Sequence, residues 1–108
     1  MRFPEAAILH PYEITLRADS EACSAANCTG QYLEDDHIVM YDDKRPFHVQ
    51  VDTVLHELRH AIWAQAGLNS IVDSVAEGSD GEKIIRAETP RLIGLLRDNP
   101  WLVKAVKL

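Results

Sequence analysis

Apolar side chains recur three or four residues apart in the middle of the chain, which is the spacing of one face of an α-helix. The positions are Val51, Val54, Leu55, Leu58, Ile62 and Ala66. This pattern predicts an amphipathic helix over about residues 50–66. Asp52 and Thr53 supply polar groups near its expected start, and Gly67 follows its last apolar position, where a left-handed residue commonly ends a helix.

Shorter runs before this helix carry β-prone side chains between turn residues, and residues 12–16, 31–33 and 37–41 are predicted strands. Residues 21–30 are small and polar, which favours a loop, and the acidic triplet at 34–36 predicts a turn. We therefore expect an α+β fold, in which a short antiparallel β-sheet of two or three strands packs on the motif helix.

Residues 67–81 are polar and glycine-rich, which predicts a linker. Periodic apolar side chains return from Glu82 and continue to Asp98, close to Pro100, which cannot extend a helix. Pro90 interrupts this C-terminal helical region and predicts a kink or a split, with Thr89 as N-cap of the second part. The apolar tail at 101–108 predicts a last short turn or helix.

Length and composition limit the class of protein. A chain of 108 residues with 46% hydrophobic and 26% charged residues is typical of one globular domain, and we expect residues 1–108 to form a single domain. No apolar run approaches the roughly 20 residues that span a bilayer, and the N-terminus lacks the apolar core of a signal peptide, which favours a cytoplasmic protein. The net charge of −6 argues against binding to nucleic acid or to an anionic membrane.

Two sequence features leave alternatives open. Cys23 and Cys28 are expected to be reduced thiols in a cytoplasmic setting, and a second zinc site is the alternative. Trp63, Trp101 and the apolar tail can complete the core or form a dimer surface, so the sequence leaves the oligomeric state open.

The predicted central helix contains the run His56-Glu57-Leu58-Arg59-His60, in which two imidazoles lie one turn apart on the same face. Neutral imidazole nitrogens are common zinc ligands, and a catalytic zinc keeps a position open for a water molecule whose pKa falls to about 7. Glu57 lies beside that position and can accept the proton of the water. The motif predicts a metal-dependent hydrolase, with Zn2+ on His56 and His60 and Glu57 as the general base.

A third protein ligand is needed to fix the geometry of such a zinc site. His60 is the last histidine of the chain, so we expect a carboxylate downstream of the motif. The candidates are Asp73, Glu77, Asp80, Glu82 and Glu88. Glu82 is favoured because it begins the periodic C-terminal stretch and can face the motif helix from a rigid element, and Glu77 and Glu88 are the main alternatives.

Two segments resemble the minimal zincins of phages and prophages, a family of HExxH metallopeptidases. Residues 53–62, TVLHELRHAI, are similar to the family's core TLLHELLHAI, and residues 95–100, LLRDNP, resemble its carboxyl-terminal signature. The resemblance covers roughly the second half of the chain and a strand before the helix. It implies a zincin-like fold and a zinc ligand at Glu82, where the family has a glutamate before its last long helix. Arg59 replaces an apolar residue of the family and is expected to point away from zinc, and the segment from Cys23 to Cys28 has no counterpart.

These observations predict a zinc metallopeptidase that hydrolyses a bond in a peptide or protein substrate. The alternative is a non-catalytic domain in which zinc stabilises a binding or regulatory protein. A structural zinc would have four protein ligands and no open position. A third hypothesis is a metal-free interaction module, whose folding and function a chelator would leave unchanged.

Overall fold

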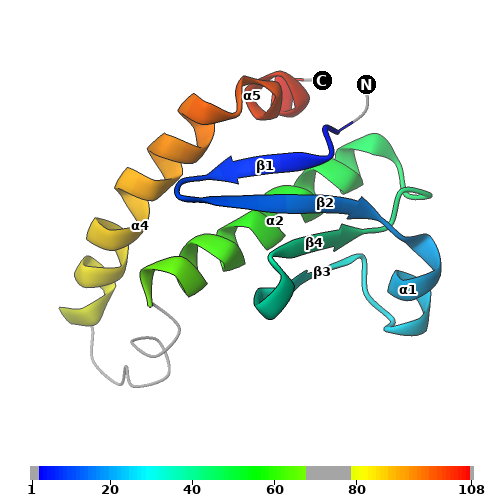
Figure 1. Cartoon of the computed structure of the whole chain (residues 1–108), viewed down its shortest axis with the longest axis horizontal. Helices are drawn as coiled ribbons and strands as arrows, with labels where there is room; N and C mark the ends of the chain where they lie inside the picture. Colours follow the sequence, from blue (N-terminus) through cyan, green and yellow to red (C-terminus); the bar gives the residue numbers. More distant parts are fainter. Residues whose placement is uncertain (1–2, 68–78, 108) are drawn as a thin grey trace.

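The computed structural model describes residues 3–67 and 79–107, with the backbone alone for residues 79–86. Along the chain the elements are β1 (Ala6–Leu9), β2 (Tyr12–Ala18), α1 (Ser20–Ala25), β3 (Gly30–Leu33), the 3-10 helix η1 (Glu34–Asp36), β4 (Ile38–Tyr41), α2 (Phe47–Ala66), α4 (Ser79–Asp98) and α5 (Pro100–Lys107) (Figure 1). The fold is α+β, which confirms the expected class. None of the described helices is long and apolar enough to cross a membrane.

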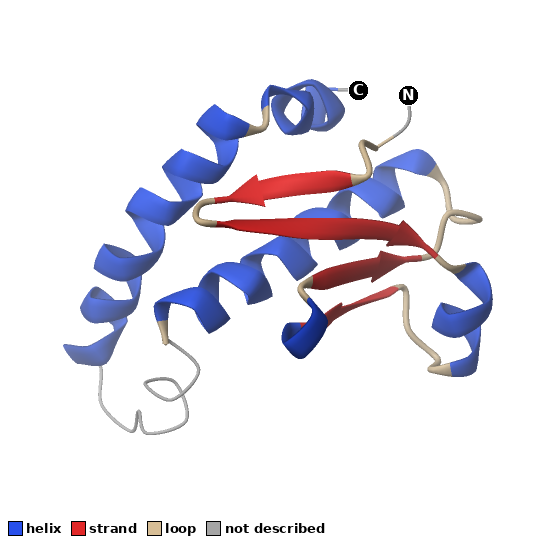
Figure 2. Ribbon diagram, viewed as in Figure 1, coloured by secondary structure: helices blue, strands red, loops and turns tan. Residues whose placement is uncertain are grey.

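The four strands form a mixed sheet in the order β1-β2-β4-β3 (Figure 2). β1 runs antiparallel to β2 and β3 antiparallel to β4, but β2 and β4 are parallel. The prediction of a purely antiparallel sheet with two or three strands was therefore wrong. β2 and β4 are connected through α1 and β3, and this longer crossover lets them run in the same direction.

α2 lies across one face of the sheet, behind the strands in the view of Figure 1. On β2, Ile14 and Leu16 are buried while their neighbours are exposed, because successive side chains of a strand point to opposite faces. The facing side of α2 buries apolar residues at helical spacing, and α4 and α5 close the core beside β1. The largest fully buried apolar side chains are Ile14, Val39, Val54, Leu58, Ile62, Leu95 and Leu102.

The helix predicted from the apolar spacing is α2, and it begins three residues earlier than expected. Pro46 precedes it, and the Pro46 carbonyl accepts hydrogen bonds from the backbone N–H groups of Val49 (3.0 Å) and Gln50 (3.1 Å). Thr53, predicted near the start, lies inside the helix and is buried. Gly67 ends α2 with φ 69°, in the left-handed conformation expected of it.

Residues 21–30, predicted as a loop, contain most of α1 and the first residue of β3. The Asp19 carboxylate accepts a hydrogen bond from the Ala22 N–H at 3.0 Å and caps this helix. β1 was not predicted either, because an Ala-Ala pair is a weak β signal. Both elements depend on contacts that a local pattern does not contain.

The C-terminal half forms two helices, α4 and α5, and confirms the predicted end of the long helix before Pro100. α4 is one helix with Pro90 inside it, so Thr89 is not the N-cap of a separate helix. Pro90 is exposed, so its ring faces solvent rather than the packed side of the helix. The predicted linker falls largely on residues 68–78, which lie outside the described residues; the linker's last residues belong to α4.

Asn99 lies between α4 and α5 and is only 2% exposed. Its side-chain amide donates to the carbonyls of Ile8 (2.7 Å) and Leu95 (2.8 Å) and accepts from the Ile8 N–H (2.8 Å). The Trp101 indole N–H donates to the same amide oxygen at 3.2 Å. One buried amide thus joins the end of α4 and the start of α5 to the outer edge of β1.

Candidate metal centre

His56 and His60 lie one turn apart on the exposed side of α2. Their Nε2 atoms are 3.2 Å apart, and their ring centroids are separated by 4.9 Å. Two nitrogens bound at about 2.05 Å to one tetrahedral zinc lie roughly 3.3 Å from each other. This separation is compatible with two ligands of a single metal ion, and it is also compatible with a hydrogen bond between the two rings.

Glu57 lies between these histidines in sequence but points to the buried side, where it is 8% exposed. Its Oε1 atom accepts a hydrogen bond from the backbone N–H of Tyr32 in β3, at 3.2 Å. A ligand atom of Glu57 and one from each imidazole lie within 4.8 Å of one another. This bond attaches one carboxylate oxygen of Glu57 to the strand, beside the imidazole pair.

A close approach of β3 to α2 makes this contact possible. A Cβ atom added to Gly30 would lie 2.4 Å from Thr53 Cγ2 and 2.8 Å from the Met40 carbonyl oxygen, both too close for real atoms. It would also lie 3.6 Å from the Glu57 side chain. Position 30 therefore has to be glycine for the strand to lie at this depth over the motif helix.

The register of β3 determines which of its backbone groups face outward. The Thr29 carbonyl accepts a hydrogen bond from the Asp42 N–H at 2.9 Å, so Gly30 is opposite Tyr41 in a non-hydrogen-bonded pair. Two residues further, Tyr32 has the same orientation, and its N–H reaches Glu57. β3 is the last strand of the sheet, so the N–H and C=O groups of Gly30 and Tyr32 point to the sheet's outer edge.

Arg59 joins the motif helix to α4. Its Nε donates to Glu88 Oε1 at 2.6 Å, and its guanidinium lies 5.7 Å from the centre of the Trp63 ring. The Arg59 hydrogen bond is the main reason that the pKa of Glu88 lies below its usual value, against the opposing effect of burial. The buried Nε1 of Trp63 has no hydrogen-bond partner among the described residues. Arg59 thus pairs with an acidic neighbour.

The structure brings His56, Glu57 and His60 together. The third protein ligand of the zinc ion stays a prediction. Glu82 and Asp80 belong to α4, but their side chains lie outside what the structure describes. Asp73 and Glu77 lie outside the described residues altogether. Glu88 is described, and both of its oxygens face Arg59, at 2.6 and 3.5 Å.

Two cavities flank the motif. One, of about 220 Å³, lies on the α4 side and is lined by His56, Arg59, His60 and Trp63. The other, of about 250 Å³, lies under β3 and is lined by Gln31, Tyr32, Glu34, Glu57, His60 and Ala64. His60 lines both cavities, and His56 lines the one on the α4 side.

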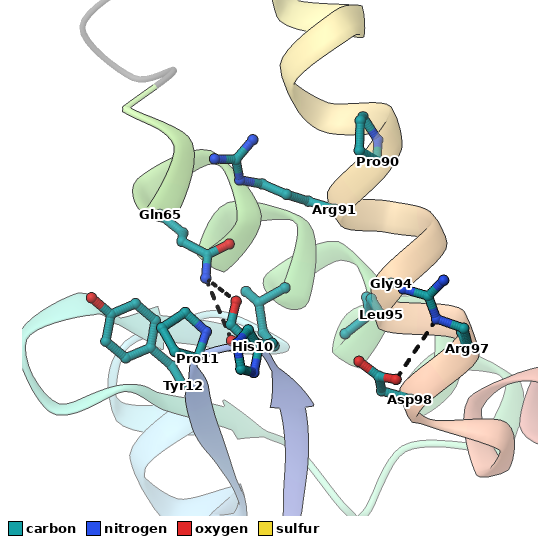
Figure 3. A pocket seen from close by; sticks show the side chains of 11 residues that line it. His10, Pro11, Tyr12, Gln65, Pro90, Arg91, Gly94, Leu95, Arg97 and Asp98 are labelled. Carbon is teal, nitrogen blue, oxygen red and sulfur yellow. Dashed lines mark hydrogen bonds and ion pairs between the residues drawn. The ribbon is translucent and has the colours of Figure 1, made fainter.

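A larger pocket, of about 580 Å³, lies away from the motif, between the β1–β2 turn, the end of α2 and the second half of α4 (Figure 3). The Gln65 side chain lines it and donates to the His10 carbonyl at 2.7 Å, and Arg97 Nε lies 3.9 Å from Asp98 Oδ1. Among its described lining residues, the only possible metal ligands are His10 in the β1–β2 turn and Asp98 at the end of α4. The chemistry expected from the sequence is therefore concentrated at the smaller cavities.

Cys23 and Cys28 are free thiols at the end of α1. Asn27 is left-handed, with φ 53°, and the Cys28 N–H donates to the Cys23 carbonyl at 3.0 Å, which is the bonding of a Schellman helix end. Burial, followed by the neighbouring Cys28, raises the pKa of Cys23 to about 11. Among the described residues, neither cysteine belongs to a group of three or more possible metal ligands.

The sequence motif identified both histidines and Glu57, but it missed the two β3 residues that complete the site. Gly30 and Tyr32 act through their backbones, and a backbone contact has no side-chain signature. Comparison of the chain with protein-family models, with curated proteins and with solved structures found no match. The functional interpretation therefore depends on the geometry described above.

Proposed function

We propose that this protein is a zinc-dependent metallopeptidase of the minimal zincin type. The observation that supports this most directly is the 3.2 Å separation of the His56 and His60 Nε2 atoms, with the Glu57 carboxylate beside them under an edge strand. An imidazole pair with a nearby carboxylate is a donor set that suits zinc. Glu82 is our proposed third ligand, on the grounds given by the sequence.

When bound, zinc would supply a water molecule of lowered pKa and polarise the carbonyl of the scissile bond. His56 and His60 would hold the ion from the exposed side of α2. Glu57 would take the proton of that water on the oxygen not bonded to Tyr32, and would then pass it to the leaving amine. The Tyr32 N–H keeps the carboxylate oriented during both transfers.

A peptide substrate has a place to lie next to these groups. The outward N–H and C=O groups of Gly30 and the C=O of Tyr32 can pair with an extended chain, as in other cases of strand addition to a sheet edge. Such a chain would run past Glu57 and His60, both of which line the cavity under β3. The edge strand would then hold the scissile bond in position for attack.

The test combines metal analysis with hydrolysis. Wild-type protein reconstituted with zinc should bind about one ion per chain, as expected for a three-ligand catalytic site, and His56→Ala and Glu82→Ala should bind much less. His48→Ala is the matched control, because His48 is an exposed histidine on the same helix outside the motif. Absence of bound zinc in the reconstituted wild type would overturn the proposal.

Glu57→Gln separates metal binding from catalysis. A glutamine oxygen can still accept the Tyr32 N–H, so the fold and the zinc content should be retained, while hydrolysis of a peptide library should fall by about 10²- to 10⁴-fold. Full activity in this variant would remove Glu57 from the role of base. Zinc bound by four protein ligands, with no hydrolysis in the wild type, would instead favour the non-catalytic, zinc-stabilised domain.

A further inference from the structure

A second cavity adjoins the cavity under β3, on the side away from the motif. That second cavity, of about 210 Å³, is lined by Leu9, Tyr12, Ile14, Tyr32, Glu34, His37, Ala61, Ala64 and Gln65. Tyr32, Glu34 and Ala64 line both cavities. These adjoining cavities are referred to together below as the β3 groove, whose lining extends from Glu57 and His60 along α2 to Tyr12 and His37.

The described lining of the β3 groove contains two carboxylates, those of Glu34 and Glu57, and no lysine or arginine. It also contains two tyrosines and the imidazoles of His37 and His60. The pKa of Tyr32 is raised by burial first and then by the negative charge of Glu34, which supports a close approach of the phenol to that carboxylate. A cation entering this groove would meet a carboxylate and aromatic faces, both of which attract it.

The backbone geometry places a substrate side chain at the groove. Gly30 and Tyr32 face α2 from β3, and an extended peptide added to this edge alternates its own side chains in the same way. Every second side chain of the peptide would therefore point toward α2. Glu34 follows β3 directly, in η1, so the carboxylate lies just beyond the strand that would hold the peptide.

We propose that the β3 groove is a subsite for the side chain of a lysine or arginine in an extended peptide, and that Glu34 determines this preference. The inference rests on the proposed peptidase function and adds a substrate class to it. The net charge of −6 acts in the same direction, because it attracts basic peptides to the protein at low salt.

The test compares internally quenched peptides that differ at one position, occupied by lysine, norleucine or glutamate and scanned on both sides of the scissile bond. With zinc-loaded wild type, one position should favour lysine over glutamate by about tenfold in kcat/KM, mainly through KM. Glu34→Gln should reduce that preference about threefold, and Glu34→Lys should reverse it. Raising the salt concentration should weaken the preference.

Glu13→Gln and Glu13→Lys are the matched controls. Glu13 is exposed on β2 next to the buried Ile14, so its side chain points to the face of the sheet opposite α2. These variants change the net charge as the Glu34 variants do, but they leave the groove unchanged. The preference for lysine should be retained in both; an equal loss in the Glu13 and Glu34 variants would assign it to overall charge and overturn the subsite.

A binding measurement separates this inference from the peptidase function. Fluorescence anisotropy with labelled lysine and glutamate peptides is run on the same proteins without metal. Selective binding of the lysine peptide that is lost in Glu34→Gln would support the groove. If the zinc-loaded wild type also hydrolyses none of the peptides, the groove would stand and the peptidase function would be overturned. Hydrolysis with no preference at any position would overturn the groove and leave the peptidase standing, and absence of both binding and hydrolysis would overturn both.

Discussion

Replacement of Asn99 by aspartate tests how the C-terminal helices are attached to the sheet. The two side chains have nearly the same shape, but aspartate has no N–H to donate. The carbonyls of Ile8 and Leu95 would lose their donors, and a carboxylate oxygen would lie in the place of the amide nitrogen, 2.7 and 2.8 Å from them. Two lost hydrogen bonds at about 1 kcal/mol each, and the burial of a charge against two carbonyls, give an expected loss of roughly 3–5 kcal/mol.

The loss is measurable because a domain of this size has a total stability of about 5–15 kcal/mol. Urea denaturation followed by circular dichroism would compare wild type, Asn99→Asp and Asn27→Asp. Asn27 is exposed at the end of α1, where a left-handed residue and the helix C-terminus disfavour aspartate slightly, so its substitution should cost no more than about 1 kcal/mol.

The pH dependence of Asn99→Asp provides a second criterion. Burial among carbonyls raises the pKa of the new carboxyl in the folded state, so the deficit is full at neutral pH and shrinks as the pH falls through that folded pKa. The protonated carboxyl regains one donor. A loss of less than about 1 kcal/mol at neutral pH would refute the reasoning that this amide is a central attachment of the C-terminal helices.

Two further predictions concern the strand over the motif and the thiols. Gly30→Ala should destabilise the protein by about 1–3 kcal/mol, because its Cβ would overlap Thr53. Gly94→Ala in α4 has room for the added Cβ and should stabilise the protein by up to about 1 kcal/mol. Equal urea midpoints for the two variants would contradict this prediction. Iodoacetamide should alkylate Cys28 well before Cys23 at pH 8, because Cys23 is buried and its pKa is about 11. Peptide mass spectrometry would follow the two reactions, and faster alkylation of Cys23 would contradict this prediction.

The sequence predicted the features that are local. The apolar spacing in α2 and the glycine after it are properties of one continuous segment, and so is the pair of histidines four residues apart. The end of α4 before Pro100 follows from the proline ring alone. The Asp19 cap of α1 was also readable, because an aspartate before a helix-prone Ser-Glu-Ala run is a start signal, but the small residues after it were interpreted as a loop.

The features that the sequence did not predict join distant segments. Tyr32 and Glu57 are 25 residues apart, and Ile8 and Asn99 are 91 apart. Short runs of β-prone residues do not specify which strands pair or in which direction, so the parallel pairing of β2 and β4 could not be derived. The third zinc ligand stays a prediction for a related reason, because its placement depends on how α4 lies against α2.

The two outer edges of the sheet differ in a way that limits self-association. At β1, the Asn99 amide occupies both the N–H and the C=O of Ile8, as a neighbouring strand would. At β3, Glu57 occupies the N–H of Tyr32, and the outward groups of Gly30 still face the edge. Open-ended growth of a continuous sheet from molecule to molecule requires two receptive edges on each molecule. Among the described strands, β1 is closed to such pairing at Ile8, so we expect a second copy to add at β3 and growth of the sheet beyond that contact to be disfavoured.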